Sequence, residues 1–186
     1  MTVEIELVRP ARAHLVSYKK ALERGWSPDN VRLEIAIREQ LAAIEADGDA
    51  FLASLDDPDG AQPPLVLPDG STVKRLPSIR RWVWDGEIAG SIGLRWQPGT
   101  AVLPPHVPGH IGYAIVPWKR GRGYATRALS LMLDEARARG LPYVDITTDP
   151  GNAISQKVIR ANGGLFVEEF EAVGYGKREQ RFRVTF

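Results

Sequence analysis

Residues 110–140 read HIGYAIVP, WKRGRG and YATRALSLMLDEARARG, and this stretch decides the fold class. The first run is apolar and ends at a proline, which predicts a β-strand that stops there. The last run repeats Ala, Leu and Met at helical spacing, so it predicts an amphipathic helix that ends at its closing glycine. A basic turn with two glycines joins them. The order strand, glycine-rich turn, helix indicates a sheet with helices packed against it.

The turn Arg120-Gly121-Arg122-Gly123 also carries the clearest chemical signal of the sequence. The first amides of a helix have no acceptor within the helix, and the helix dipole makes that end positive. Glycines let a phosphate approach the backbone, and arginines supply charge that pairs with it. The turn therefore predicts a phosphate-binding site, although a glycine pair alone also occurs in ordinary turns.

Two common phosphate-binding motifs do not fit. A P-loop ends in Gly-Lys-Ser/Thr, whereas Gly123 is followed by Tyr124-Ala125-Thr126. A dinucleotide fold needs a third glycine where Thr126 stands, although Asp145 lies about where a ribose-binding acid would. The chain after the helix is also too short for a doubly wound sheet.

The flanking segments extend the pattern in both directions. Outside residues 110–140 we expect a first strand before Pro10, helices over 11–24 and 27–46, a long loop over 56–77 with a short strand at 65–67, a hairpin of 80–84 and 87–96, a strand over 143–148, a short helix over 152–161, and final strands over 165–170 and 178–186. This order predicts an α/β (α+β) protein with a mixed, mostly antiparallel central sheet flanked by about four helices. We expect one domain over residues 1–186.

Composition excludes several classes of function. The chain has no cysteine, which excludes disulfides, thiolate metal sites and a cysteine nucleophile. Its net charge of +1 gives no field that would attract nucleic acid or an anionic membrane. No signal peptide or membrane-spanning run is found, so we expect a cytoplasmic protein that binds neither nucleic acid nor membrane.

The run Arg120-x-x-Gly123-x-Ala125 between strand and helix resembles the acetyl-CoA signature of the GNAT superfamily of N-acetyltransferases. The segment PGNAISQKVIRANGG, residues 150–164, resembles the second motif of that family. The resemblance implies a GNAT-like fold and acetyl-CoA as co-substrate, without a metal. It also implies direct attack, in a ternary complex, by a primary amine of a small molecule, peptide or protein, and a possible homodimer. The alternative is a catalytically silent CoA-binding sensor or regulatory module.

The resemblance further divides the single domain and assigns its cofactor contacts. Residues 1–80 would form the acceptor side, 81–164 the acetyl-CoA core and 165–186 the C-terminal strands. The cofactor-binding residues would be Ile115, Val116, Arg120, Gly121, Arg122, Gly123, Tyr124, Ala125, Thr126, Asn152 and Ser155.

The second motif departs from the family at its proton donor. Many members carry a tyrosine where this chain has Ile159. We take Ser155 as the first candidate for the acid that protonates the leaving thiolate, with Tyr175 as an alternative. Ser155 is equally well explained as a hydrogen-bonding residue at the start of a helix.

A base that accepts the amine proton needs a pKa near neutrality. His110 is the candidate, because it begins the strand that leads to the expected acetyl site. Glu87 and Asp145 are alternatives, the first on a hairpin turn and the second on an apolar strand.

The acceptor pocket should come from the first two helices and the long loop, as the resemblance implies. The side chains considered for it are Asp56, Asp57, Asp59, Trp82, Trp84 and Arg95. The aspartates can also form a solvated turn and the tryptophans a core. Arg95 would bind a carboxylate of the acceptor.

Overall fold

The computed structural model describes residues 4–67 and 69–186. Its helices are α1 (Arg12–Glu23), α2 (Leu33–Ala46), α3 (Gly48–Ala53), α4 (Tyr124–Ala138) and α5 (Ala153–Ala161), with a 3-10 turn η1 (Pro117–Lys119). Its strands are β1 (Glu6–Val8), β2 (Leu65–Val66), β3 (Thr72–Val73), β4 (Ser78–Trp84), β5 (Ile88–Arg95), β6 (Ile111–Ile115), β7 (Tyr143–Thr148), β8 (Leu165–Ala172) and β9 (Lys177–Thr185). The predicted class, a mostly antiparallel sheet with flanking helices, is confirmed.

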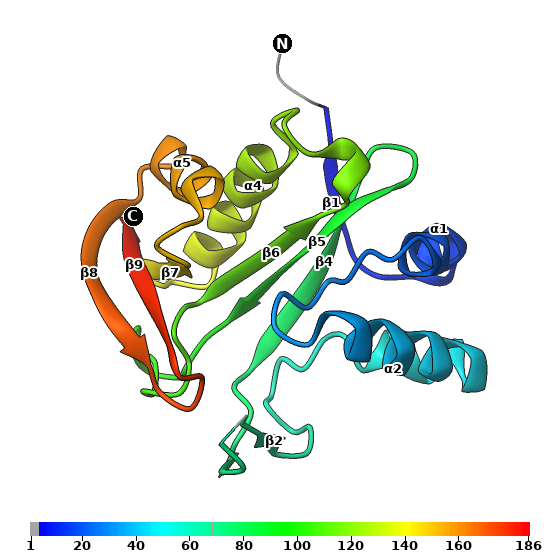
Figure 1. Cartoon of the computed structure of the whole chain (residues 1–186), viewed down its shortest axis with the longest axis horizontal. Helices are drawn as coiled ribbons and strands as arrows, with labels where there is room; N and C mark the ends of the chain where they lie inside the picture. Colours follow the sequence, from blue (N-terminus) through cyan, green and yellow to red (C-terminus); the bar gives the residue numbers. More distant parts are fainter. Residues whose placement is uncertain (1–3, 68) are drawn as a thin grey trace.

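The central sheet consists of two parts that meet at one end (Figure 1). One part has the strand order β1-β4-β5-β6 and the other β7-β9-β8, and every pairing within them is antiparallel. The N–H of His110 donates to the carbonyl of Asp145 over 2.7 Å and joins β6 to β7 at their starts. Beyond this bond, no ladder pairs the two strands within the described residues, so the sheet opens between them.

Helices lie on both faces of the sheet (Figure 1). On one face, α4 packs against the first part and α5 packs against α4 and β7; on the other face lie α1 and α2. The connection from β6 to β7 runs through α4, as a parallel crossover requires. This arrangement puts the start of α4 at the open end of the gap between β6 and β7.

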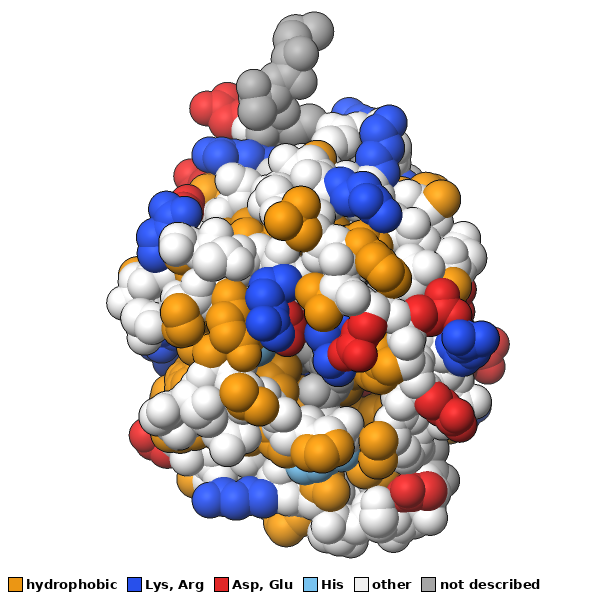
Figure 2. Space-filling model, turned by 90° about the vertical axis from the view of Figure 1, so that its left-hand side faces the viewer, with side chains coloured by type: hydrophobic (Ala, Val, Ile, Leu, Met, Phe, Trp, Pro, Cys, Tyr) orange, Lys and Arg blue, Asp and Glu red, His pale blue; other side chains and the backbone are white. Residues whose placement is uncertain are grey.

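The outer side of the second part is formed by α5 and the edge strand β8, and Figure 2 shows this side of the molecule. Leu165, Phe166 and Val167 are exposed on β8. The next residues of the strand are Glu168 and Glu169, and charged side chains lie among the apolar ones in Figure 2. The exposed apolar residues are therefore interrupted by charge along this edge, as is usual for an edge strand.

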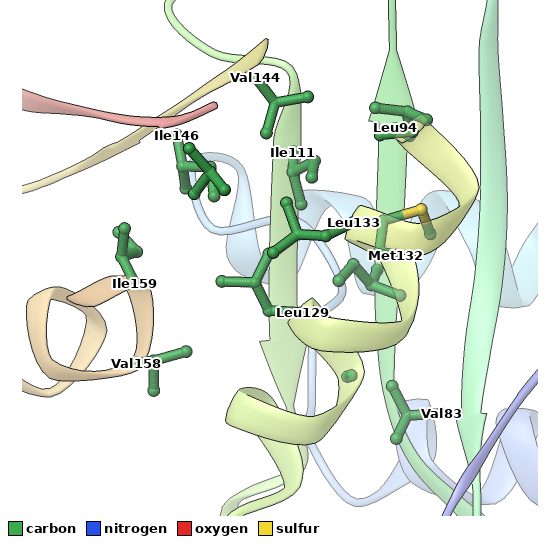
Figure 3. Close-up of a cluster of buried hydrophobic side chains, with 14 of the residues drawn as sticks. Val83, Leu94, Ile111, Leu129, Met132, Leu133, Val144, Ile146, Val158 and Ile159 are labelled. Carbon is green, nitrogen blue, oxygen red and sulfur yellow. The ribbon is translucent and has the colours of Figure 1, made fainter. Parts of the chain in front are cut away.

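The core on the α4 side holds the two parts of the sheet together (Figure 3). Leu129 and Met132 of α4 are fully buried against Ile111 of β6, Ile146 of β7 and Ile159 of α5. Full burial of one such side chain stabilises the fold by about 1.5–3 kcal/mol. The helical spacing predicted for α4 is thus the spacing that the core uses.

A second core anchors α1 and α2 to the opposite face. The rings of Trp82 on β4 and Tyr18 on α1 stack with centroids 4.2 Å apart, and both side chains are buried. The hydroxyl of Tyr18 donates to Oε1 of Gln40 on α2 over 2.6 Å. Trp82 is therefore a core residue that binds helix to sheet, not a pocket wall.

The second helix starts later than the sequence predicted, at Leu33. The Ser27 hydroxyl donates to the Asp29 carbonyl instead of capping a helix. The carboxylate of Asp29 accepts the amides of Val31 and Arg32, which holds the chain in a turn before the helix.

The short helix α3 was not predicted. It begins where Asp47-Gly48 was expected to end the second helix. The carboxylate of Asp47 accepts the amides of Asp49 and Ala50, so this residue caps a new helix as it ends the old one. The described residues therefore contain five α-helices where about four were expected. None of them combines the length and apolar character that a membrane crossing requires.

Candidate functional site

The gap between β6 and β7 exposes backbone groups of β6. The N–H of Arg95 donates to the His110 carbonyl over 2.9 Å, and that of Val116 donates to the Ala89 carbonyl over 3.0 Å. Alternate residues of an antiparallel strand direct their backbone groups to opposite edges. The backbone N–H and C=O groups of Ile111, Tyr113 and Ile115 therefore point into the gap between β6 and β7.

Side chains already occupy the carbonyls along this free edge. Nδ2 of Asn30, from the loop between α1 and α2, donates to the carbonyl of Tyr113 over 3.2 Å. Nε of Arg120 donates to the carbonyl of Ile115 over 3.0 Å. For the N–H groups of Tyr113 and Ile115, the described chain supplies no acceptor. The edge of β6 can thus donate hydrogen bonds to a ligand in the gap.

The glycine-rich turn adopts the conformation that only its glycines allow without strain. Gly121 has φ +71° and Gly123 has φ +84°, in the left-handed region. The first helical bond of α4 runs from the N–H of Arg127 to the carbonyl of Gly123, over 3.0 Å. In residues 4–67 and 69–186, no acceptor is found for the backbone amides from Gly121 through Thr126. This run of free amides at the positive end of a helix can bind an anion.

An ion pair fixes the turn against the hairpin between β4 and β5. Nζ of Lys119 donates to Oδ1 of Asp85 over 2.6 Å, and the hydroxyl of Tyr124 donates to Oδ2 over 2.5 Å. Burial tends to raise the pKa of Asp85, but these two hydrogen bonds outweigh it and lower the pKa. Glu87 reaches the same Lys119 over 3.0 Å, with a mostly exposed side chain. The side chain of Tyr124 therefore points to the hairpin, and only its amide belongs to the turn.

The remaining predicted residues around the turn differ in what they can offer. Val116 uses its N–H for Ala89, and its carbonyl accepts the N–H of Lys119 over 3.0 Å, so no backbone donor of Val116 remains free. Arg122 is exposed, with its guanidinium 5.8 Å from the ring of Tyr124. Arg120 is exposed too, although its Nε is held by β6.

The second motif meets β6 through two hydroxyl groups. Oδ1 of Asn152 accepts the N–H of Ser155 over 3.0 Å and caps α5. The Oγ of Ser155 lies 2.8 Å from the hydroxyl of Tyr113 on β6, where either atom can donate. Burial raises the pKa of Tyr113, with the Ser155 hydrogen bond opposing it, so the phenol stays protonated at neutral pH.

Sequence reasoning missed Tyr113, although a signal was present. Tyr113 alternates with Ile115 in HIGYAIVP, so both side chains point to the face that α4 and α5 cover. A polar tip on an apolar face needs a partner. Ser155 supplies it from 42 residues away.

His110 and Asp145 lie where the two parts of the sheet join. His110 is fully buried, and its Nδ1 accepts the N–H of Asp145 over 2.9 Å. Burial lowers the pKa of His110, with Asp145 opposing the shift. The carboxylate of Asp145 is bound by Nε and Nη2 of Arg183 over 2.7 and 2.8 Å. These contacts favour a structural role for both residues.

The acceptor-side candidates separate into structural residues and cleft residues. The carboxylate of Asp56 accepts the N–H of Arg80, and that of Asp57 accepts two loop amides. Arg95 and Tyr175 line a cleft on the α1 side of the sheet. Tyr175, the alternative acid, thus lies on this cleft, while Ser155 contacts Tyr113 on the opposite face.

Residues 68–164, more than half of the chain, match the family model described as an acetyltransferase (GNAT) domain. No curated protein matches the sequence.

Several solved structures are similar along nearly the whole chain. The microcin C7 self-immunity acetyltransferase MccE, in complex with acetyl-CoA and AMP, is 14% identical, with 98% of this chain and 93% of that chain covered and a TM-score of 0.61. The ribosomal L7/L12 alpha-N-protein acetyltransferase RimL, in complex with coenzyme A, is 12% identical, with 100% and 96% covered and a TM-score of 0.63. Mycobacterium smegmatis RimJ, in complex with CoA-disulfide, is 16% identical, with 97% and 81% covered and a TM-score of 0.59. At sequence identities this low, the structural similarity establishes a shared fold and nothing more.

Proposed function

The chain belongs to the GNAT family of acetyltransferases, and from this premise we propose that it transfers an acetyl group from acetyl-CoA to a primary amine. The observation that carries the proposal is the run of free amides from Gly121 to Thr126 at the start of α4. This run of amides lies beside the gap between β6 and β7, where the N–H groups of Tyr113 and Ile115 are free among the described residues. A long ligand with a phosphate at one end and amide groups along its arm fits both features.

The cofactor contacts follow from the same groups. We propose that the amides of Gly121 to Thr126 hold the pyrophosphate, and that Arg120 and Arg122 add charge at its edge. The N–H groups of Tyr113 and Ile115 would then bind the pantetheine arm. Nδ2 of Asn152 is available as a further donor, because only Oδ1 is used as the cap. The side chain of Val116, fully buried in the second core, supplies packing.

Two hydroxyls are available for proton transfer. In the reaction, a C–N bond forms to the acetyl carbon as the C–S bond breaks, the amine loses one proton and the sulfur gains one. We propose that Tyr113 and Ser155, hydrogen-bonded to each other over 2.8 Å, supply the proton that the sulfur gains. Tyr113 would then be the proton donor in place of the tyrosine that many family members carry at the position of Ile159.

In this proposal His110 is not the base that accepts the proton of the amine. That imidazole is closed from solvent and its Nδ1 is occupied. We propose that the acceptor enters as the neutral amine, its ammonium proton already lost to solvent. The second proton, which the nitrogen releases as the C–N bond forms, then passes through solvent to the Tyr113–Ser155 pair and replaces the one given to the sulfur. The kcat/KM for the acceptor should then rise tenfold per pH unit up to the pKa of the amine.

Release of thiol from acetyl-CoA in the presence of primary amines tests the proposed activity. The panel should include amino acids, short peptides with free N-termini and polyamines. The proposal expects turnover with at least one class, and loss of turnover in Tyr113→Phe. Binding of CoA without turnover of any amine would instead support the silent sensor. The acceptor class, a homodimer, the cytoplasmic location and the single domain over 1–186 stay predictions.

A further inference from the structure

Two arginines lie side by side on the face of the sheet opposite Tyr113. Arg80 of β4 is two residues before Trp82, whose ring packs on α1, so both side chains point to the α1 side. Arg95 ends β5. Gly93 and Gly112 are direct cross-strand partners on β5 and β6. They form the floor beneath both guanidinium groups.

The distances to this floor place the two charges close together. A Cβ added to Gly93 would lie 3.1 Å from Nη1 of Arg80. A Cβ added to Gly112 would lie 3.6 Å from Nη2 of Arg95. Since paired Cα atoms of this kind are about 5.5 Å apart, the guanidinium groups are neighbours. At Gly93 even a Cβ would press on the guanidinium of Arg80, whereas at Gly112 it would only touch that of Arg95.

Neither guanidinium has a partner in the part of the chain that the structure describes. No hydrogen bond or ion pair of either side chain is found there. The adjacent Arg81, in contrast, pairs with Asp56 and Glu135. The Arg95 side chain reaches solvent, and the protein packed around it, followed by the charge of Arg80, lowers its pKa. Two unpaired like charges on one surface repel, and a bound anion would relieve that repulsion.

The charged residues of the cleft around them are all basic. It has a volume of about 220 Å³ and is walled by the loop after α3, by β4 and β5, and by His106 and Tyr175. Lys74 and Arg75 add their charges to it, and no Asp or Glu is among its lining residues. The carboxylate of Glu179 opposes this shift in the pKa of Arg95, and it is itself paired with Lys177 over 2.7 Å.

We propose that this cleft binds a carboxylate or phosphate group of the acceptor, so that the substrate of the enzyme is an amine that also carries an anionic oxygen group. This inference rests on the proposed acetyl transfer. Gly112, beneath the guanidinium of Arg95, is followed by Tyr113, whose side chain meets Ser155 on the opposite face. One residue of strand spans about 3.3 Å. Because the arginines and Tyr113 lie on opposite faces of the sheet, an acceptor with its anion on the arginines would reach Tyr113 through the gap along the free edge of β6.

Binding of simple anions tests the cleft directly. The protein is first saturated with CoA, so that the turn at Gly121 is filled, and inorganic phosphate or acetate is then titrated by calorimetry. We expect binding that weakens about 10–100-fold in Arg80→Gln and in Arg95→Gln. Arg38→Gln, which removes an exposed charge of α2, should bind as the wild type does. Equal binding in all four proteins, or none in the wild type, would overturn the inference.

Matched acceptors distinguish the two anions. β-Alanine is compared with its amide, and phosphoethanolamine with ethanolamine, by thiol release from acetyl-CoA. The charged member of at least one pair should have the higher kcat/KM, and the preference should collapse in Arg95→Gln with the KM for acetyl-CoA unchanged. The pair that responds identifies carboxylate or phosphate as the group bound. If CoA fails to bind at all, the proposed function is wrong; if CoA binds and neutral acceptors are used equally well, only the anion site is wrong.

Discussion

The two faces of β6 carry two sites of opposite construction. On the α4 side, the site is made of backbone amides from Gly121 to Thr126 and of the free edge of β6, all within one short stretch of chain. On the α1 side, the cleft is made of side chains, with Arg80 and Arg95 brought together by strand pairing and by a separate loop. A site built from local backbone can be recognised from its sequence motif. A site built from distant side chains requires the fold.

The largest effect expected on the backbone site comes from placing a carboxylate in the glycine-rich turn. Gly121 has φ +71° and Gly140, at the far end of α4, has φ +77°, and a Cβ at either meets open space. Gly121→Asp and Gly140→Asp therefore carry similar backbone strain. We expect the first to weaken CoA binding about 100-fold by repelling phosphate, and the second to leave it unchanged. Calorimetry measures the CoA affinity of both variants. An equal loss of affinity in the two would mean that backbone strain, and not charge repulsion in the turn, weakens binding.

A second prediction concerns the hydroxyl pair of Tyr113 and Ser155, on the α4 side of β6. Tyr113→Phe should lower kcat about 100-fold, because the proton donor is lost, with little change in the KM for acetyl-CoA. Ser155→Ala should lower kcat about 10-fold, since Tyr113 remains. Tyr143→Phe on β7 is the control, because its hydroxyl makes no hydrogen bond among the described residues. A wild-type kcat in Tyr113→Phe would exclude this residue as the donor.

The smallest effect is expected at the anchor of the turn. Asp85→Asn removes the charge that holds Lys119 and Tyr124, and it should lower the free energy of unfolding by about 1–3 kcal/mol at pH 7. The pKa of Asp85 is lowered in the fold from its ordinary value of 3.8. Its contribution is therefore complete above pH 3.8 and is lost as the pH falls below that value.

Urea unfolding at pH 7 and near pH 3 checks this prediction. The difference between wild type and Asp85→Asn should shrink at the lower pH. Asp134→Asn, on the exposed surface of α4, should match the wild type at both. A difference that stays constant with pH would show that the charge of Asp85 does not stabilise the turn.

The sequence predicted those features that depend on neighbours in the chain. The strand before Pro117, the turn and the helix α4 follow from local periodicity and glycine position. The late start of α2 did not, because the carboxylate of Asp29 accepts the amides of Val31 and Arg32 and holds these residues in a turn where a helix was predicted.

Contacts between distant residues were beyond sequence reasoning. The Tyr113–Ser155 contact joins residues 42 positions apart, and the Arg80 and Arg95 cluster depends on the pairing of Gly93 with Gly112. Arg95 was identified alone, as a carboxylate ligand, and its neighbour was not. The burial of His110, which argues against its expected role as a base, depends in the same way on how β6 meets β7.

The central claim is that the backbone amides of one turn hold the phosphate end of CoA. A titration of the ¹⁵N-labelled protein with CoA, followed through its amide resonances, tests it most directly. The account predicts that the largest shifts fall on Gly121 to Thr126, that Tyr113 and Ile115 follow, and that the amides of Arg80 and Arg95 change least. Shifts concentrated in the arginine cleft, with the turn unchanged, would contradict it.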